Sequence, residues 1–173
     1  MPFTLFHLGP ALLIGIIGWR YLDLPTLILG SILVDIRTIF VLLDVLNAPL
    51  HGILHTLIGG TLLSFILIGG ITPFREYIGE KMAEINLPQA SNDSTIVSAA
   101  FLSIYLHIIL DSITYTDIQP FMPLIQNPLL GLTTSNVITA LCVFTAILGL
   151  SLIPWRAGSL NGGRNISEIV RSI

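Results

Sequence analysis

Residues 51–70, His-Gly-Ile-Leu-His-Thr-Leu-Ile-Gly-Gly-Thr-Leu-Leu-Ser-Phe-Ile-Leu-Ile-Gly-Gly, are the stretch that decides the fold. They contain no Lys, Arg, Asp or Glu, and they lie within a longer charge-free run that covers 45–74. A helix needs about 20 mostly apolar residues to cross the hydrocarbon core of a bilayer. Further charge-free runs cover 1–19, 94–110 and 118–155. These runs predict several membrane-spanning helices.

The composition of the 173-residue chain also indicates a membrane environment. Hydrophobic residues make up 53% and charged residues 10%, whereas a soluble domain carries about 25% charge. These values argue against a soluble enzyme and a disordered chain, and the net charge of −3 argues against a nucleic-acid partner. Cys142 is the only cysteine, which excludes a disulfide scaffold. We expect an all-α, polytopic integral membrane helical bundle.

A single membrane domain over residues 1–173 is expected, with about five transmembrane helices and one interfacial amphipathic helix. The amphipathic helix is predicted over 73–85, where apolar residues recur at helical spacing among charged ones. Segment 114–134 contains three prolines, so we expect it to be irregular and either buried in protein or lining a cavity. The predicted spans are roughly 8–21, 25–46, 51–70, 94–113 and 135–154.

The basic residues predict an orientation, because Lys and Arg favour the cytoplasmic side of a membrane. With five spans, all the basic residues of the connections fall on one side: Arg20, Arg75, Lys81, Arg156, Arg164 and Arg171. The N-terminus is then outside and the C-terminus cytoplasmic. On this map every histidine lies in the outer half of the membrane, although the histidines were not used to set the orientation.

The histidines and two aspartates predict a metal site. His51 and His55 are spaced i and i+4, which places both imidazoles on one face of a helix, and His107 and Asp111 repeat this spacing. Imidazole and carboxylate suit zinc, with manganese or iron as alternatives. Asp35 is also the candidate catalytic residue. The candidate metal ligands, enough for one or two divalent ions, are His7, Asp35, His51, His55, His107 and Asp111.

Alternative roles exist for these polar residues. Each histidine could bond only a neighbouring backbone group or hydroxyl, but ionisable side chains are costly to place in lipid, which favours a shared functional site. Asp117 either accepts a hydrogen bond from a metal ligand or is a solvated loop residue. Arg37 lies two residues after Asp35, about 200° around a helix, so both side chains cannot face one site.

These motifs resemble the membrane-bound metal-dependent hydrolases, a family that includes the LexA-binding inner-membrane hydrolase group. The resemblance covers about residues 1–132, and it implies that the six candidate ligands bind metal for phosphoester hydrolysis. It also implies a distant similarity to zinc-dependent phospholipase C. The matching motifs, in chain order, are Met1-Pro2-Phe3-Thr4 with His7, Gly30-Ser31 up to Asp35, His51-Gly52-x-x-His55, His107-x-x-x-Asp111, Pro120-Phe121-x-Pro123 and Asn127-Pro128.

The expected function is therefore metal-dependent hydrolysis of a lipid or lipid-linked phosphoester, with membrane lipid as both environment and substrate. One alternative is a lipid amidase or esterase of ceramidase-like type. Another is a non-enzymatic structural subunit of a membrane complex. A metal or proton transporter is disfavoured, because the predicted cytoplasmic half offers no relay of histidines or acidic residues. The sequence leaves open whether the chain forms a homo-oligomer.

Overall fold

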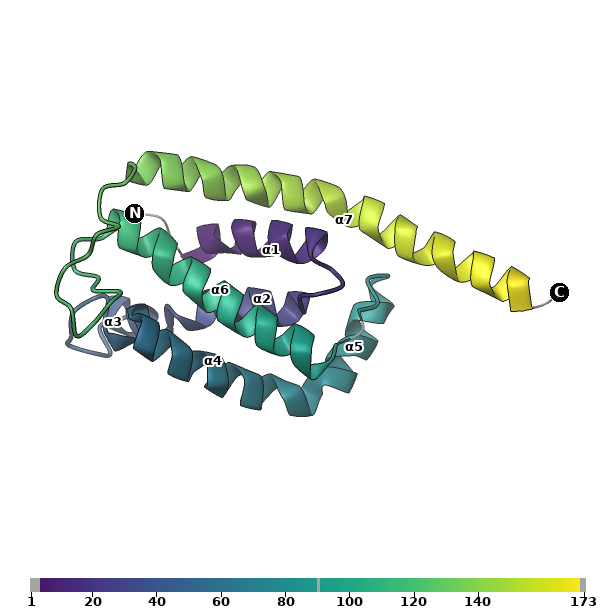
Figure 1. Ribbon diagram of the computed structural model, residues 1–173, viewed down its shortest axis with the longest axis horizontal. Helices are drawn as coiled ribbons and strands as arrows, with labels where there is room; N and C mark the ends of the chain where they lie inside the picture. The colour runs from purple at the N-terminus through teal and green to yellow at the C-terminus, as the bar shows by residue number, and fades with distance from the viewer. Residues whose placement is uncertain (1–3, 90, 172–173) are drawn as a thin grey trace.

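The computed structural model describes residues 4–89 and 91–171, and every regular element in these ranges is a helix. The helices form an elongated bundle in which α1 begins and α7 ends at opposite ends (Figure 1). In chain order the elements are η1 (Thr4–His7), α1 (Leu8–Ile17), α2 (Leu24–Leu33), α3 (Ile36–Leu42), η2 (Ile53–His55), α4 (Leu57–Ile71), η3 (Thr72–Phe74), α5 (Arg75–Glu84), α6 (Asp93–Thr114) and α7 (Ser135–Arg171).

Several of these helices are long and apolar enough to cross a membrane. Three stretches meet this condition by themselves: Leu57–Glu84, Asp93–Thr114 and Ser135–Ser159. α2 and α3 together make a fourth candidate span, and Leu5–Ile17 is a shorter apolar helix. The predicted class, a helical membrane protein, is confirmed.

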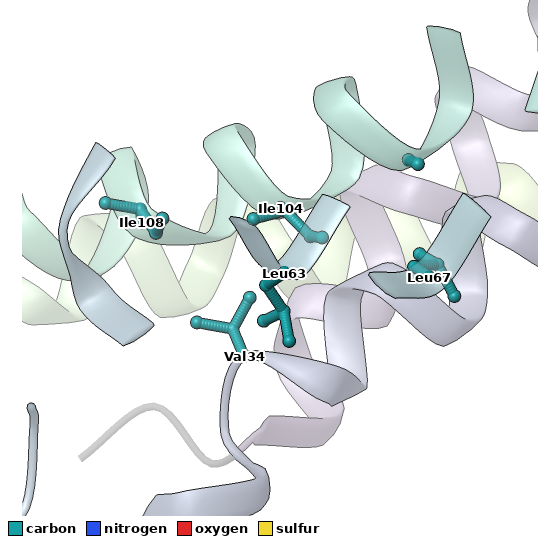
Figure 2. Packing of buried hydrophobic residues seen from close by; sticks show 6 residues of the cluster. Val34, Leu63, Leu67, Ile104 and Ile108 are labelled. Carbon is teal, nitrogen blue, oxygen red and sulfur yellow. The ribbon is translucent and has the colours of Figure 1, made fainter. Parts of the chain in front are cut away.

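α6 forms the centre of the bundle. α2 and α4 pack on α6, while α1 packs against α7 and α2 (Figure 1). Between α4 and α6 lies an apolar core in which Leu63 and Leu67 of α4 meet Ile104 and Ile108 of α6, with Val34 beneath them (Figure 2). Each of these side chains is buried, and their burial stabilises the packing of α4 on α6.

The helix predicted over 25–46 is not continuous. It is bent by 40° between α2 and α3, at Val34 and Asp35. The backbone N–H of Asp35 donates to the carbonyl of Ile32 at 3.1 Å, which is the tighter i to i−3 spacing of a 3-10 turn. Aspartate is a poor residue for a helix interior. The break turns the Asp35 carboxylate toward histidines from other elements, so a continuous helix was the wrong expectation here.

The segment between α6 and α7 is irregular but not buried. Leu124, Ile125 and Leu132 are 68%, 78% and 67% exposed, and Leu124 and Ile125 line a hollow of about 650 Å³, which agrees with the cavity-lining alternative. The segment lies past the ends of α6 and α7, at one end of the bundle (Figure 1). Its backbone is held there by Asn127, whose Nδ2 donates to the carbonyl of Ser112 at 2.8 Å. It is also held by the carbonyl of Pro120, which accepts a hydrogen bond from the N–H of Leu57 at 2.8 Å.

Candidate metal centre

The polar site is built from helix ends and breaks at the end of the bundle near the α6–α7 connection. Asp35 lies at the break between α2 and α3, His55 ends η2, and His7 ends η1 just before α1. His107 and Asp111 lie on one face in the last two turns of α6. All five side chains belong to residues that are at most 5% exposed.

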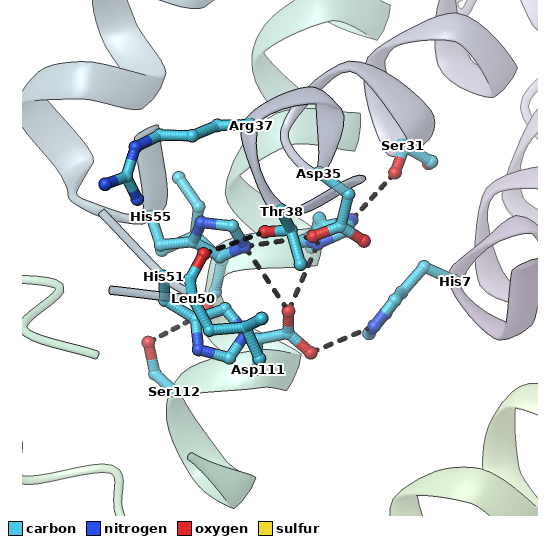
Figure 3. A network of polar contacts seen from close by, with 12 residues as sticks. His7, Ser31, Asp35, Arg37, Thr38, Leu50, His51, His55, Asp111 and Ser112 are labelled. Atoms are coloured by element: carbon cyan, nitrogen blue, oxygen red, sulfur yellow. Dashed lines mark hydrogen bonds and ion pairs between the residues drawn. The ribbon is translucent and has the colours of Figure 1, made fainter. Parts of the chain in front are cut away.

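Four of these residues offer ligand atoms that lie within 4.8 Å of one another: Asp35, His55, His107 and Asp111. Three of them, Asp35, His55 and Asp111, are labelled in Figure 3. The Nε2 of His55 is 3.2 Å from Oδ1 of Asp35 and 3.6 Å from Oδ2 of Asp111. The Nε2 of His107 is 3.5 Å and 3.2 Å from the same two oxygens. A tetrahedral zinc ion with bonds of about 2.1 Å keeps its ligand atoms about 3.4 Å apart. The group therefore has a size and a donor set that could hold a metal ion.

The tautomer of His107 supports a cation at this point. Its Nδ1 lies 2.7 Å from the carbonyl of Ser31, which can only accept, so Nδ1 donates. In a neutral imidazole this leaves a lone pair on Nε2, which faces the Asp111 carboxylate. Among the described residues, Nε2 of His107 has no aligned hydrogen-bond partner. Metal-ligating histidines commonly donate their other ring N–H to a backbone carbonyl in this way.

The charge of the four-residue group also favours a bound cation. Asp35 and Asp111 bring two carboxylates into a buried region, and burying unbalanced charge is costly. A divalent cation between neutral His55 and His107 would balance both carboxylates. The chemistry of the donors and their spacing thus fit the expected metal.

His7 lies next to this group but outside it. Its Nε2 is 2.9 Å from Oδ1 of Asp111, while Oδ2 of the same carboxylate faces His55 and His107. The rings of His7 and His107 are stacked with centroids 4.2 Å apart. Asp111 therefore connects His7 to the four-residue group through its second oxygen.

The His51 imidazole hydrogen-bonds to a residue outside the four-residue group. Its Nδ1 donates to the carboxylate of Asp117, at 2.9 Å from Oδ1 and 3.0 Å from Oδ2. Its ring contacts the rings of His55 and Tyr115, with centroids 4.7 Å and 4.3 Å away. His51 is not part of the four-residue group. Asp117 thus accepts a hydrogen bond from one of the histidines of the predicted site.

The placement of His51 and His55 on one α-helix was a wrong expectation. α4 begins only at Leu57, because the side chain of Thr56 caps it by accepting from the N–H of Gly59 at 3.0 Å. His51 precedes the short 3-10 turn that His55 ends, and Gly52 between them has extended backbone. The i, i+4 spacing therefore does not align the two rings.

His55 and Tyr115, which lie outside the membrane-spanning helices, have raised pKa values. Burial by itself would lower the pKa of His55, but hydrogen bonds to Asp111 and Asp35 outweigh it and raise the pKa above its usual value. Burial, together with the charges of Asp111, Asp35 and Asp117, raises the pKa of Tyr115 to about 12. The Tyr115 hydroxyl therefore stays protonated at neutral pH.

Arg37 supports the loop that carries His51 rather than reaching the four-residue group. Its Nη1 donates to the carbonyl of Pro49 at 2.9 Å. Its neighbour Thr38 donates to the carbonyl of Leu50 at 3.2 Å. A methyl group at Gly52 would lie 2.2 Å from Nη1 of Arg37, so the guanidinium would have to shift to accommodate it. Together these contacts attach residues 49–52 to α3.

Sequence reasoning missed two groups of the site. The Ser31 carbonyl orients His107, but a backbone carbonyl has no signal in the sequence. Tyr115 packs on His51 and could have been found, because it continues the spacing of four residues from His107 to Asp111.

A family model described as YdjM inner membrane protein matches residues 4–167. The chain belongs to this family. The match supports the membrane part of the resemblance seen in the motifs, while hydrolysis and the similarity to phospholipase C stay predictions. No curated protein and no solved structure matched the chain.

Proposed function

We propose that this member of the YdjM family is a metal-dependent hydrolase that acts on a phosphoester of a lipid or lipid-linked substrate. The observation that carries the proposal is the buried group of Asp35, His55, His107 and Asp111, with ligand atoms within 4.8 Å of one another. Imidazole nitrogen and carboxylate oxygen together favour zinc, with manganese and iron as alternatives. The bilayer around the bundle supplies a lipid substrate directly.

The residues around the ligands have separable tasks in this proposal. A divalent ion supplies a nucleophile from water at neutral pH and positive charge for a phosphoryl oxygen. Asp35, the candidate catalytic residue, is one of the ligands. His51 donates Nδ1–H to Asp117, which leaves its Nε2 lone pair to accept a proton from the attacking water. Burial of the ligands excludes bulk water and strengthens these electrostatic interactions.

A second candidate function is a structural metal site in a non-enzymatic membrane subunit, and the number of ligands favours it. Structural zinc sites are closed by four protein ligands, whereas catalytic sites keep one position for water. Here four protein ligands are available from the break after α2, from η2 and from α6. A lipid amidase or esterase would use the same metal chemistry as the phosphoester hydrolase, so the substrate must distinguish these two.

The experiment begins with metal content. The protein is purified in mild detergent without chelators, and metals are counted by elemental mass spectrometry in wild type, Asp111→Asn and Asp44→Asn. Asp44 is a matched control, because it lies outside the group and has a φ of 58°, which asparagine adopts readily. We expect about one equivalent of zinc in wild type and control, and a large loss in Asp111→Asn.

Activity then separates the candidates. Metal-loaded protein is tested on phospholipids, lipid-linked phosphoesters and lipid amides, with the Asp111→Asn variant as the blank. Phosphoester cleavage that depends on Asp111 supports the proposal, and amide cleavage supports the amidase. Bound metal without turnover of any of these favours the structural site. Absence of metal after incubation with zinc would refute all three.

We also infer that the N-terminus faces outward and the C-terminus lies in the cytoplasm. Two observations support this orientation. α5, which carries Arg75 and Lys81, lies at the end of the bundle where α7 leaves it, and the metal centre lies at the other end (Figure 1). The basic residues and the histidines are thus separated along the bundle axis, and positive charge favours the cytoplasmic side.

A further inference from the structure

An apolar groove runs along the outside of the bundle between α2 and α4. Both helices pack mainly on α6, and the space left between them forms a hollow of about 430 Å³. Leu29 and Leu33 of α2 form one wall, Ile66 and Gly70 of α4 form the other, and Phe74 closes the end near α5. Among the described residues, no charged side chain lines the hollow.

A second hollow of about 160 Å³ extends this groove toward the metal centre. It shares Leu29, Leu33 and Leu67 with the first and continues to Ile36 and Ile39 of α3. Ile36 directly follows the metal-centre residue Asp35. From residue 29 to residue 39 the groove extends for about 15 Å along α2 and α3, at about 1.5 Å per residue. This stretch equals about half of a hydrocarbon core of about 30 Å, and the first hollow continues from it to Phe74 near α5.

The groove is continuous with the surface that faces the bilayer. Ile66 on its wall and Leu62 one turn earlier on α4 are 66% and 59% exposed, and both lie on a helix that is long and apolar enough to span. Water in such a groove would lack hydrogen-bond partners along the walls. Lipid tails are the apolar molecules that surround these helices.

We propose that the groove binds the acyl chain of a phospholipid, with the head-group end at α3 and the tail toward α5. Binding of the acyl chain in the groove does not depend on any enzymatic activity of the protein. The role of this chain as the tail of the substrate rests on the function proposed above. The ester end would then lie beside the break at Asp35, where α3 begins, while the tail remains in the α2–α4 groove. The substrate class is thereby a lipid that stays in the bilayer during hydrolysis.

The test uses two adjacent glycines as a matched pair. A methyl group at Gly69 or Gly70 meets nothing within 4 Å, so both positions accept a larger side chain. Only Gly70 lines the groove. Gly70→Leu therefore fills the groove, and Gly69→Leu adds the same side chain elsewhere on α4. A second pair, Leu29→Trp and Leu62→Trp, repeats the comparison. Leu29 lies on the opposite wall of the groove, whereas Leu62 is exposed on α4 and does not line the groove.

Binding is measured by photo-crosslinking in nanodiscs of phosphatidylethanolamine and phosphatidylglycerol that contain phosphatidylglycerol with a diazirine on its acyl chain. The labelled peptides are mapped by mass spectrometry. We expect labelling concentrated on the α2 and α4 walls, falling about tenfold in Gly70→Leu if the leucine displaces about two methylene contacts. Labelling in Gly69→Leu should stay at the wild-type level.

Even labelling around the bundle would overturn the proposal, as would an equal loss in both members of each pair. Crosslinking needs no turnover, so it reports on the groove even if the protein hydrolyses nothing. In an active protein, Gly70→Leu should reduce cleavage of long-chain lipid but not of bis(p-nitrophenyl) phosphate, which has no acyl chain. Equal effects on both substrates would contradict a role for the groove in substrate binding.

Discussion

Replacement of Gly9 by alanine should separate α1 from α7. Gly9 is buried in the first turn of α1, where the helix crosses α7. The added methyl carbon would lie 2.1 Å from the carbonyl oxygen of Cys142 and 2.9 Å from the backbone nitrogen of Ala146. An ordinary carbon–oxygen contact is about 3.3 Å. The two backbones must therefore move apart by about 1.2 Å, because neither contact is to a flexible side chain.

The energetic effect follows from two opposing contributions. Overpacking of a dense interface costs about 1–3 kcal/mol, and helix–helix contacts in membranes depend on such close approach. Alanine gains up to about 1 kcal/mol over glycine as a helix former, which offsets part of this cost. We expect Gly9→Ala to lower the free energy of unfolding by about 1–2 kcal/mol. In a chain of this size that lowers Tm by about 2–8 °C.

The assay is thermal unfolding in one detergent of wild type, Gly9→Ala and Gly69→Ala. Gly69 is the control, because a methyl group there meets nothing within 4 Å. It should leave Tm unchanged or raise it slightly. Equal stability of Gly9→Ala and wild type would refute the close α1–α7 contact, and so would an equal loss in both variants. Because His7 precedes Gly9 by two residues, Gly9→Ala should also displace His7 from Asp111.

Four further predictions concern the site and the orientation. Asp117→Asn should reduce hydrolysis about 10–100-fold while leaving metal content unchanged, because Asp117 holds His51 and not the metal group; a loss of metal in this variant would contradict that division. Since folding raises the pKa of His55, this group should stabilise chelator-treated protein fully below about pH 6.5 and lose that contribution as pH rises through the raised value. Zinc must displace the same proton, so zinc affinity should increase with pH over this range, as calorimetric titrations at several pH values can show. A C-terminal fusion to green fluorescent protein should fluoresce and one to alkaline phosphatase should be inactive; the reverse pattern would place the C-terminus outside.

The membrane-spanning helices could be predicted from the sequence because membrane insertion depends on local hydropathy. The charge-free run 94–110 lies inside α6, and the run 118–155 contains the apolar part of α7. The break in the helix at Asp35 could not be predicted in the same way. Nothing near it in the sequence is a glycine or proline that would end a helix, and the carboxylate turns inward because histidines from η2 and α6 are there.

The site was predicted as a set of residue types, but its internal arrangement was not. His107 and Asp111 lie on one face of α6, as their spacing requires of any regular helix. His51 and His55 have the same spacing, yet Thr56 caps α4 after them, so they do not share a helix face and their rings meet in a T-shaped contact. Threonine before an apolar run is a helix-start signal in the sequence. Spacing is therefore informative only once the position of the helix start is known.

A proton and a metal ion are two ways to join the acceptors of this site, and the four-residue group could hold a metal ion. If His107 were protonated, its Nε2–H should point along a hydrogen bond to Asp111 or Asp35. Those oxygens are 3.2 Å and 3.5 Å away, but neither aligns as an acceptor. A metal ion needs no such N–H alignment, since it attracts both lone pairs toward one common point. Four nitrogen–oxygen separations of 3.2–3.6 Å are close to the ligand spacing of about 3.4 Å in a tetrahedral zinc site, so the group could hold a cation.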